Sequence, residues 1–363
     1  MSDTQNKTPK IRRRNVIIRP FSYIKSSVGM EIFLTLIFLG IQIILLVLSK
    51  SFSAVAVISA ATAGSVCANF GAAYFSKLNR SRYFSYPICI AQGIITGMLL
   101  PETYPPLTVF LAVLLSMIVI KYFFGGFSYS LVNPCVFSAA VLWLIGAKLF
   151  GQIELTADML AARNPSQILI ESGLFPTADF DAPITDALNG TIFNFLKVSV
   201  PEGYVSLFWD SRSIIPAFRF NFITLLSSAV LFAADKMKIV ISSCFLAVYL
   251  LLVRFLSPVF FHGIPLQGDI LLALLTGGTL FTAVFVLNWY GTIPESLHGK
   301  IVYGVLAGAA AFFISGCGTS PAGMIFTVLL VNFISVLIQF FERKADISRT
   351  HKLVGQMTRN KDF

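Results

Sequence analysis

The chain alternates between apolar runs and short polar breaks. Ten of the runs are long enough, or nearly so, to cross about 30 Å of hydrocarbon, which takes roughly 20 helical residues. They fall near residues 30–49, 53–75, 86–100, 107–124, 135–150, 217–234, 239–256, 268–288, 301–317 and 321–341. This pattern predicts an all-α integral membrane protein with about ten transmembrane helices.

Glycine pairs interrupt the pattern once in each half. Gly125 and Gly126 precede the fifth run, and Gly277 and Gly278 lie inside the eighth. The third and fifth runs are also short for a full span, which is typical of broken helices that face a protein-lined cavity. Five runs, an interruption and five more runs predict two five-helix repeats. An odd number of spans in each repeat makes the two copies inverted.

The fifth run opens with Asn133 and Pro134. Asparagine caps helix N-termini, and proline suits the first helical turn, so we expect a helix to begin here. We expect Asn133 to shape a central cavity together with the glycines of the two breaks.

A polar excursion separates the two groups of runs. Its run Asp186-Ala187-Leu188-Asn189-Gly190-Thr191 contains an Asn-Gly pair, which favours a sharp turn. The chain therefore divides into five predicted parts. These are a basic tail at 1–28, a first five-helix repeat at 29–150, the excursion at 151–216, a second repeat at 217–341, and a short, charged, frayed tail at 342–363.

Composition supports the membrane assignment. The chain is 56% hydrophobic and 12% charged, with a mean hydropathy of +0.80, whereas soluble domains carry about 25% charged residues. The net charge of +10 does not indicate nucleic-acid binding, because the Lys and Arg residues are concentrated on one side of the predicted membrane topology. With ten alternating spans, most Lys and Arg fall on the side of the two termini, which predicts cytoplasmic termini and an extracytoplasmic excursion.

Few ionisable residues fall within the runs. Glu31, Lys121, Arg254 and Asp269 all lie near span ends, where we expect long side chains to reach the membrane interface. The sequence shows no metal-ligand spacing, no catalytic motif and no dinucleotide-binding motif. We therefore predict no catalytic residue and no metal site on this chain alone.

Several landmarks coincide with one family. Lys121, Gly125 and Gly126 followed by Asn133-Pro134 resemble that family's Lys-x-x-x-Gly-Gly and Asn-Pro elements. The break at 275–278, the stretch at 299–304 and the closing segment at 321–332 are similar to other elements of it. Over about residues 30–342, the chain resembles RnfD, a membrane component of the Rnf ion-translocating electron-transport complex. The same family includes the homologous membrane component of the sodium-pumping NADH:quinone reductase.

The resemblance implies a subunit of a redox-driven Na⁺ or H⁺ pump in the bacterial inner membrane, in contact with lipid and other Rnf subunits. Members typically carry FMN joined by a phosphoester to a threonine in the long extracytoplasmic loop, attached there by a flavin transferase. The family's motif for flavin attachment maps best onto Thr191, with Asp186 as the recognition acid and Gly190 before the acceptor. One residue is missing, however, and Asn189 stands where Ser or Thr is expected. Thr185 is the acceptor in an alternative register.

The resemblance also suggests a second, non-covalent flavin in the central cavity, near Gly125, Gly126, Asn133, Gly277 and Gly278. Two other interpretations stay open. Inverted repeats with broken helices also describe solute channels and permeases. A subunit that has lost its flavin and serves as a scaffold of the same complex is the third interpretation.

Overall fold

A computed structural model describes residues 28–75, 82–123, 131–151, 177–197, 199–234, 237–260, 266, 268–289, 291–315 and 320–359. The residues in these ranges form helices, turns and loops and no strand, which confirms the all-α prediction. Most of the basic tail, residues 152–176 of the excursion, and Gly125 and Gly126 lie outside the described residues.

All ten predicted runs coincide with helical segments. The first group comprises α1 (Val28–Leu48), α2 (Phe52–Phe75), α3 (Arg82–Met98), α4 (Pro106–Met117) with the π-helical η1 (Ile118–Phe123), and α5 (Pro134–Gly146) with the 3-10 helix η2 (Ala147–Phe150). The second comprises α11 (Asn221–Ala233), α12 (Ile239–Phe260), α13 (Ile270–Thr276), α14 (Thr279–Phe281), η5 (Thr282–Val286), α15 (Leu297–Ser315) and α16 (Gly323–Arg359). Among the described residues, α1, α2, α12, α15 and α16 are long and apolar enough to cross a membrane, and the others are shorter.

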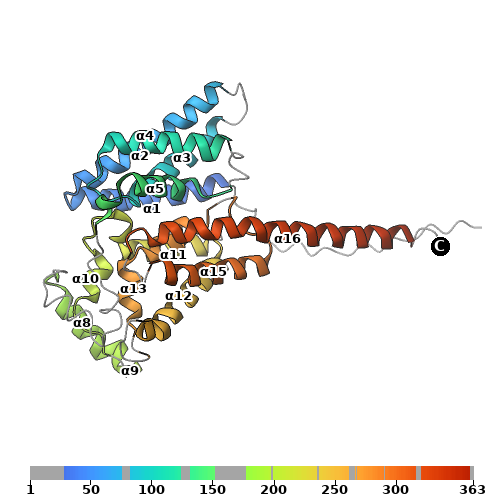
Figure 1. Cartoon of the computed structure of the whole chain (residues 1–363). Coiled ribbons are helices and arrows are strands. Elements are labelled where there is room, and N and C mark those ends of the chain that lie inside the picture. Colours follow the sequence, from blue (N-terminus) through green and yellow to red (C-terminus); the bar gives the residue numbers. More distant parts are fainter. Residues whose placement is uncertain are drawn as a thin grey trace, which may run out of the picture.

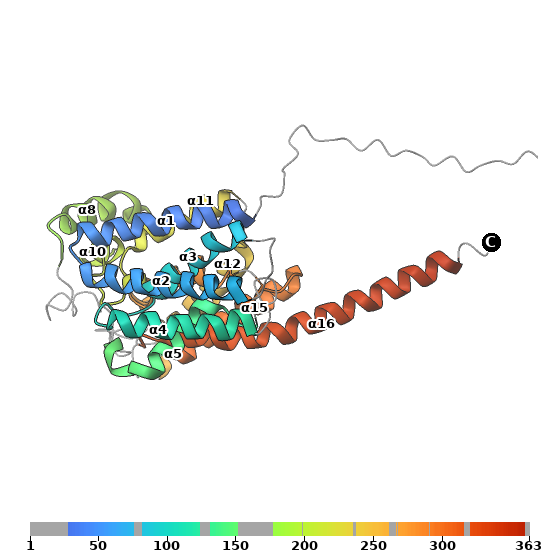
Figure 2. The ribbon, with the colours of Figure 1, turned by 90° about the horizontal axis from the view of Figure 1, so that it is seen from above.

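The two groups lie side by side (Figure 1), with α1 against α11 and α5 against α16. The helices of the excursion, α8 (Asp181–Leu188), α9 (Asn194–Leu196) and α10 (Tyr204–Trp209), gather at one end of the bundle. At the other end α16 projects well beyond its neighbours (Figure 2). The excursion and the C-terminal part of α16 are therefore at opposite ends of the molecule.

Close backbone contact holds each group together. A Cβ on Gly97 of α3 would lie 2.6 Å from the Cα of Ile58 in α2, and one on Gly64 of α2 would lie 2.7 Å from the Phe110 carbonyl oxygen in α4. In the second group, a Cβ on Gly308 of α15 would lie 2.7 Å from the Phe245 carbonyl oxygen in α12. Helices that lack a hydrophobic drive in lipid pack through such small residues.

Two predicted boundaries are confirmed and one is wrong. Asn133 caps α5, with its side chain accepting from the Cys135 N–H at 3.0 Å, and Pro134 is the first helical residue. The helix also breaks at Gly277 and Gly278, between α13 and α14. The frayed tail expected after residue 342 is instead a continuation of α16 to Arg359. Its Glu, Lys and Arg residues are good helix formers, which accounts for the difference.

Candidate functional site

The described part of the excursion is a compact helical unit. Helix α8 runs on through the π-helical η3 (Asn189–Phe193) into α9. The prediction of a sharp turn at Asn189-Gly190 is wrong, because both residues are helical. The Asn189 side chain donates to the Val200 carbonyl and accepts from the Val200 N–H, both at 2.9 Å. It therefore fixes the returning chain against the helix instead of turning the chain.

Asp181, at the start of α8, organises this unit. Its buried carboxylate accepts hydrogen bonds from the Gly203 N–H at 2.8 Å, from the Ser206 N–H at 2.6 Å and from the Ser206 hydroxyl at 2.5 Å. Burial alone would raise the pKa of this carboxyl. The hydrogen bonds from Gly203 and Ser206 outweigh burial and lower the pKa below its ordinary value. The charged carboxylate thus joins α8 to α10.

The two candidate threonines have opposite environments. Thr185 is 2% exposed, and its hydroxyl donates to Asp181 Oδ1 at 3.1 Å. Thr191 is exposed on η3, and its hydroxyl donates to the Ala187 carbonyl at 2.7 Å. Thr191 is therefore the accessible threonine of the two, and Thr185 is enclosed.

The surroundings of Thr191 are open. Asp186 and Gly190 are both exposed, and a Cβ placed on Gly190 would meet no atom within 4 Å. Ile192 and Phe195, on the same segment, are 57% and 89% exposed. The segment therefore has room for a bulky group on the hydroxyl and offers apolar side chains beside it.

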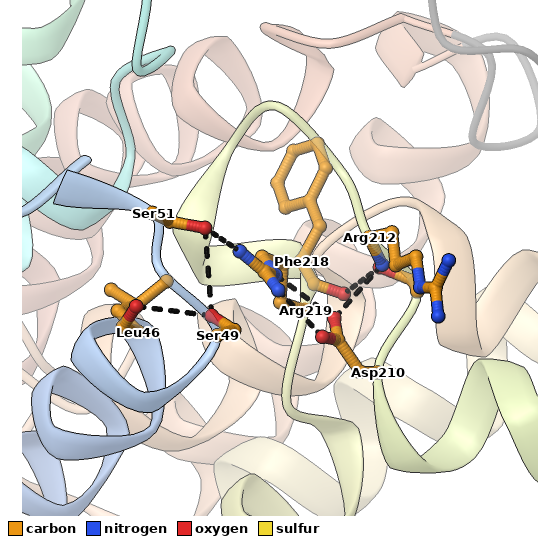
Figure 3. Close-up of polar contacts among 8 residues, drawn as sticks. Leu46, Ser49, Ser51, Asp210, Arg212, Phe218 and Arg219 are labelled. Atoms are coloured by element: carbon orange, nitrogen blue, oxygen red, sulfur yellow. Dashed lines mark hydrogen bonds and ion pairs between the residues drawn. The ribbon is translucent and has the colours of Figure 1, made fainter. Parts of the chain in front are cut away.

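An ion pair that sequence reasoning missed fixes the excursion to the bundle (Figure 3). Arg219 donates from Nε to Asp210 Oδ1 at 2.9 Å and from Nη2 to Asp210 Oδ2 at 2.6 Å. Its Nη1 donates to the Ser51 hydroxyl at 2.6 Å, between α1 and α2. The two side chains are only 8% and 17% exposed. One guanidinium thus joins the end of α10, the start of α11 and the first group of helices.

The sequence held one signal of this pair. Arg219 lies at the start of the sixth predicted run, residues 217–234. A cation in such a place needs a partner.

The described residues at the two predicted breaks contact different neighbours. Asn133, which is completely buried, donates from Nδ2 to the Val286 carbonyl at 3.0 Å. Gly278 has a φ of +68°, and a Cβ there would overlap the Phe218 ring, so this glycine is required by the backbone and by close packing. Gly277, with a φ of −91°, ends α13. The structure thus brings Asn133 to the eighth run, while Gly278 lies against Phe218.

Lys121 does not reach the membrane interface as expected. It is 5% exposed, and its Nζ lies 3.0 Å from Gln92 Oε1 and 2.9 Å from Cys89 Sγ on α3. These polar partners compensate part of the cost of burying an ammonium group. Lys121 therefore belongs to the interior of the first group of helices.

These features define a multi-pass helical membrane protein with a folded segment at one end. The family model for the NQR2, RnfD and RnfE proteins matches residues 15–348, and the chain belongs to this family. The chain is 23% identical over 278 residues, or 72% of its length and 78% of the relative's, to the D component of the ion-translocating oxidoreductase complex of Shewanella amazonensis. The protein of the same name from Citrobacter koseri is 25% identical over 272 residues, covering 69% of this chain and 76% of that protein.

Proposed function

We propose that this chain is a membrane subunit of an ion-translocating oxidoreductase complex of the Rnf type. Its role would be to pass electrons through FMN attached to Thr191 while Na⁺ or H⁺ crosses the membrane. Family membership and the names of the relatives support the complex and its other subunits as partners. The exposed Thr191 hydroxyl supports the flavin, and it is the observation that carries the proposal.

The residues around Thr191 fit a covalently attached FMN. The hydroxyl is exposed, the space beside Gly190 is open, and the exposed carboxylate of Asp186 is one turn away for recognition by a flavin transferase. When bound, FMN supplies a carrier that accepts and passes on electrons. The chain's own contribution is positional, because Asp181 and the Arg219–Asp210 pair hold the segment to the bundle.

We further propose that the two groups of helices are inverted repeats and that ions pass near their interface. Helix breaks at mid-membrane are typical of ion and substrate paths. The hydrogen bond from Asn133, at the start of α5, to Val286, at the end of η5, joins the two groups. A second, non-covalent flavin near these breaks stays a prediction. In this proposal the chain lies in a bacterial inner membrane, with its excursion outside and both ends in the cytoplasm.

In-gel flavin fluorescence of the denatured polypeptide, co-expressed with its transferase, tests the attachment. We expect a signal in the parent chain and in the matched control Thr185→Val, and none in Thr191→Val, at equal protein amounts. Loss in Thr185→Val with retention in Thr191→Val would place the flavin in the other register. A dark parent chain that still assembles with partner subunits would identify a flavin-less scaffold, and one that assembles with none would favour the channel interpretation.

A further inference from the structure

A cavity of about 560 Å³ lies at the end of the bundle remote from the excursion, where α12 and α15 begin. Three cations from three different elements line it. Lys238 directly precedes α12, Lys300 is in the first turn of α15, and Arg343 is on α16. One carboxylate, that of Glu295, is also in the lining. The cavity therefore has a positive charge balance and suits an anionic ligand.

One helix end at the cavity adds to this preference. Helix α12, 22 residues long, starts there, and the N-terminus of a helix carries positive partial charge. The start of α15 is already bonded by the Glu342 carboxylate, which accepts from the Glu295 and Ser296 N–H groups at 3.1 and 3.2 Å. Lys300 Nζ donates to the Glu295 carbonyl oxygen at 2.8 Å, which holds its ammonium group over the loop at the cavity wall. Charge and backbone dipoles thus favour the same class of ligand.

The other wall of the cavity is apolar. Leu131, Ile293 and Val336 contribute to it. On α16 the residues Val336, Gln339 and Arg343 follow at intervals of three and four, so one face of this helix passes from apolar to basic along the cavity. Beside that face, Leu337 and Phe340 are 60% and 61% exposed. The cavity thus lies where the apolar part of α16 gives way to its charged part.

We propose that this cavity binds the phosphate head group of an anionic phospholipid. Lys238, Lys300 and Arg343 would contact the phosphate, and the acyl chains would follow the exposed apolar side chains of α16. Basic pockets between membrane helices bind such head groups. A free phosphate ion would contact only the cations, whereas a lipid would also contact the apolar wall. The presence of that wall therefore favours a lipid over a free phosphate ion. The site is independent of the flavin proposed at Thr191.

Thermal unfolding of the purified full-length protein in detergent tests the site. We would titrate it with phosphatidylglycerol, phosphatidylcholine or inorganic phosphate. The variant Lys238→Gln/Lys300→Gln/Arg343→Gln is compared with the charge-matched control Lys148→Gln/Lys197→Gln/Arg212→Gln, whose substitutions lie at exposed positions near the excursion end. Each cation near anionic lipid contributes roughly fivefold in affinity. We therefore expect the cavity variant to need about a hundredfold more phosphatidylglycerol for the same rise in Tm.

The expected pattern is a rise with phosphatidylglycerol in the parent and control chains, and no rise with phosphatidylcholine or inorganic phosphate. An equal rise with inorganic phosphate would identify a small-anion site and overturn the lipid assignment. Equal responses of the cavity and control variants, including no response in either, would also overturn it. If the cavity variant keeps its lipid response but no longer co-purifies with partner subunits, the cavity is a protein-docking surface instead.

Discussion

Arg219 offers the sharpest test of how the excursion is held. Replacing it by methionine leaves the Asp210 carboxylate without its cationic partner and with only the hydrogen bond from the Arg212 N–H. It also removes two charge-assisted hydrogen bonds and breaks the contact with Ser51. Loss of one member of a buried pair costs about 3–5 kcal/mol. Asp210 keeps 17% exposure, so we expect the lower end, about 3 kcal/mol of the free energy of unfolding.

Thermal unfolding in detergent, read together with limited proteolysis of residues 177–219, measures this loss. Replacing both partners, as in Arg219→Met/Asp210→Leu, should recover most of it, because no buried charge is then left alone. The control is Arg212→Gln, since the Arg212 side chain is exposed and points away from Asp210 (Figure 3). Its effect should stay within about 0.5 kcal/mol. The reasoning fails if Arg219→Met is as stable to unfolding as Arg212→Gln, or if the double variant is less stable than Arg219→Met.

Three further predictions concern the excursion and the helix breaks. Gly278→Ala should lower Tm clearly, because a left-handed alanine costs about 1–2 kcal/mol and its Cβ meets Phe218. Gly277→Ala, at a φ of −91°, adds no such backbone strain and should lower Tm less; equal effects would contradict this. Asn133→Ala should cost about 2–3 kcal/mol through loss of the cap and of a buried hydrogen bond. Asn133→Ser, which keeps an acceptor for the Cys135 N–H, should lower Tm less; the reverse order would be inconsistent with the capping role. The lowered pKa of Asp181 means that its contribution is complete above the ordinary value of about 3.9 and is lost as pH falls through the lower folded value. Hydrogen exchange at the Gly203 and Ser206 amides should therefore stay slow at pH 5 and accelerate, relative to the intrinsic exchange rate, in strong acid. Asp181→Asn should abolish this acid-induced acceleration. If the acceleration persists in that variant, another group causes it.

Local chemistry explains what could be predicted from the sequence. The start of α5 follows from Asn133 and Pro134, which act within one helical turn, and the break after α13 follows from two adjacent glycines. Apolar length alone located the ten helical runs. In each case the deciding residues are neighbours in the chain.

Long-range partners explain which features could not be predicted from the sequence. Asp181 bonds to residues 22 and 25 positions away, and Arg219 reaches Ser51 across 168 positions. Asn189 was expected to form a turn, but its pairing with Val200 keeps it helical. Lys121 was expected at the membrane interface, but Gln92, from a different helix, retains it inside. No local pattern encodes these contacts.

Sided cysteine labelling of intact cells tests the central claim most directly, namely that the α8–η3 segment displays Thr191 outside the cell while α16 ends inside. A thiol at Gly190→Cys has open space around it, and one at Lys344→Cys is exposed on α16. The account predicts that a membrane-impermeant maleimide labels the first in intact cells and the second only after permeabilisation. Labelling of position 344 from outside, with position 190 protected until the membrane is opened, would contradict it.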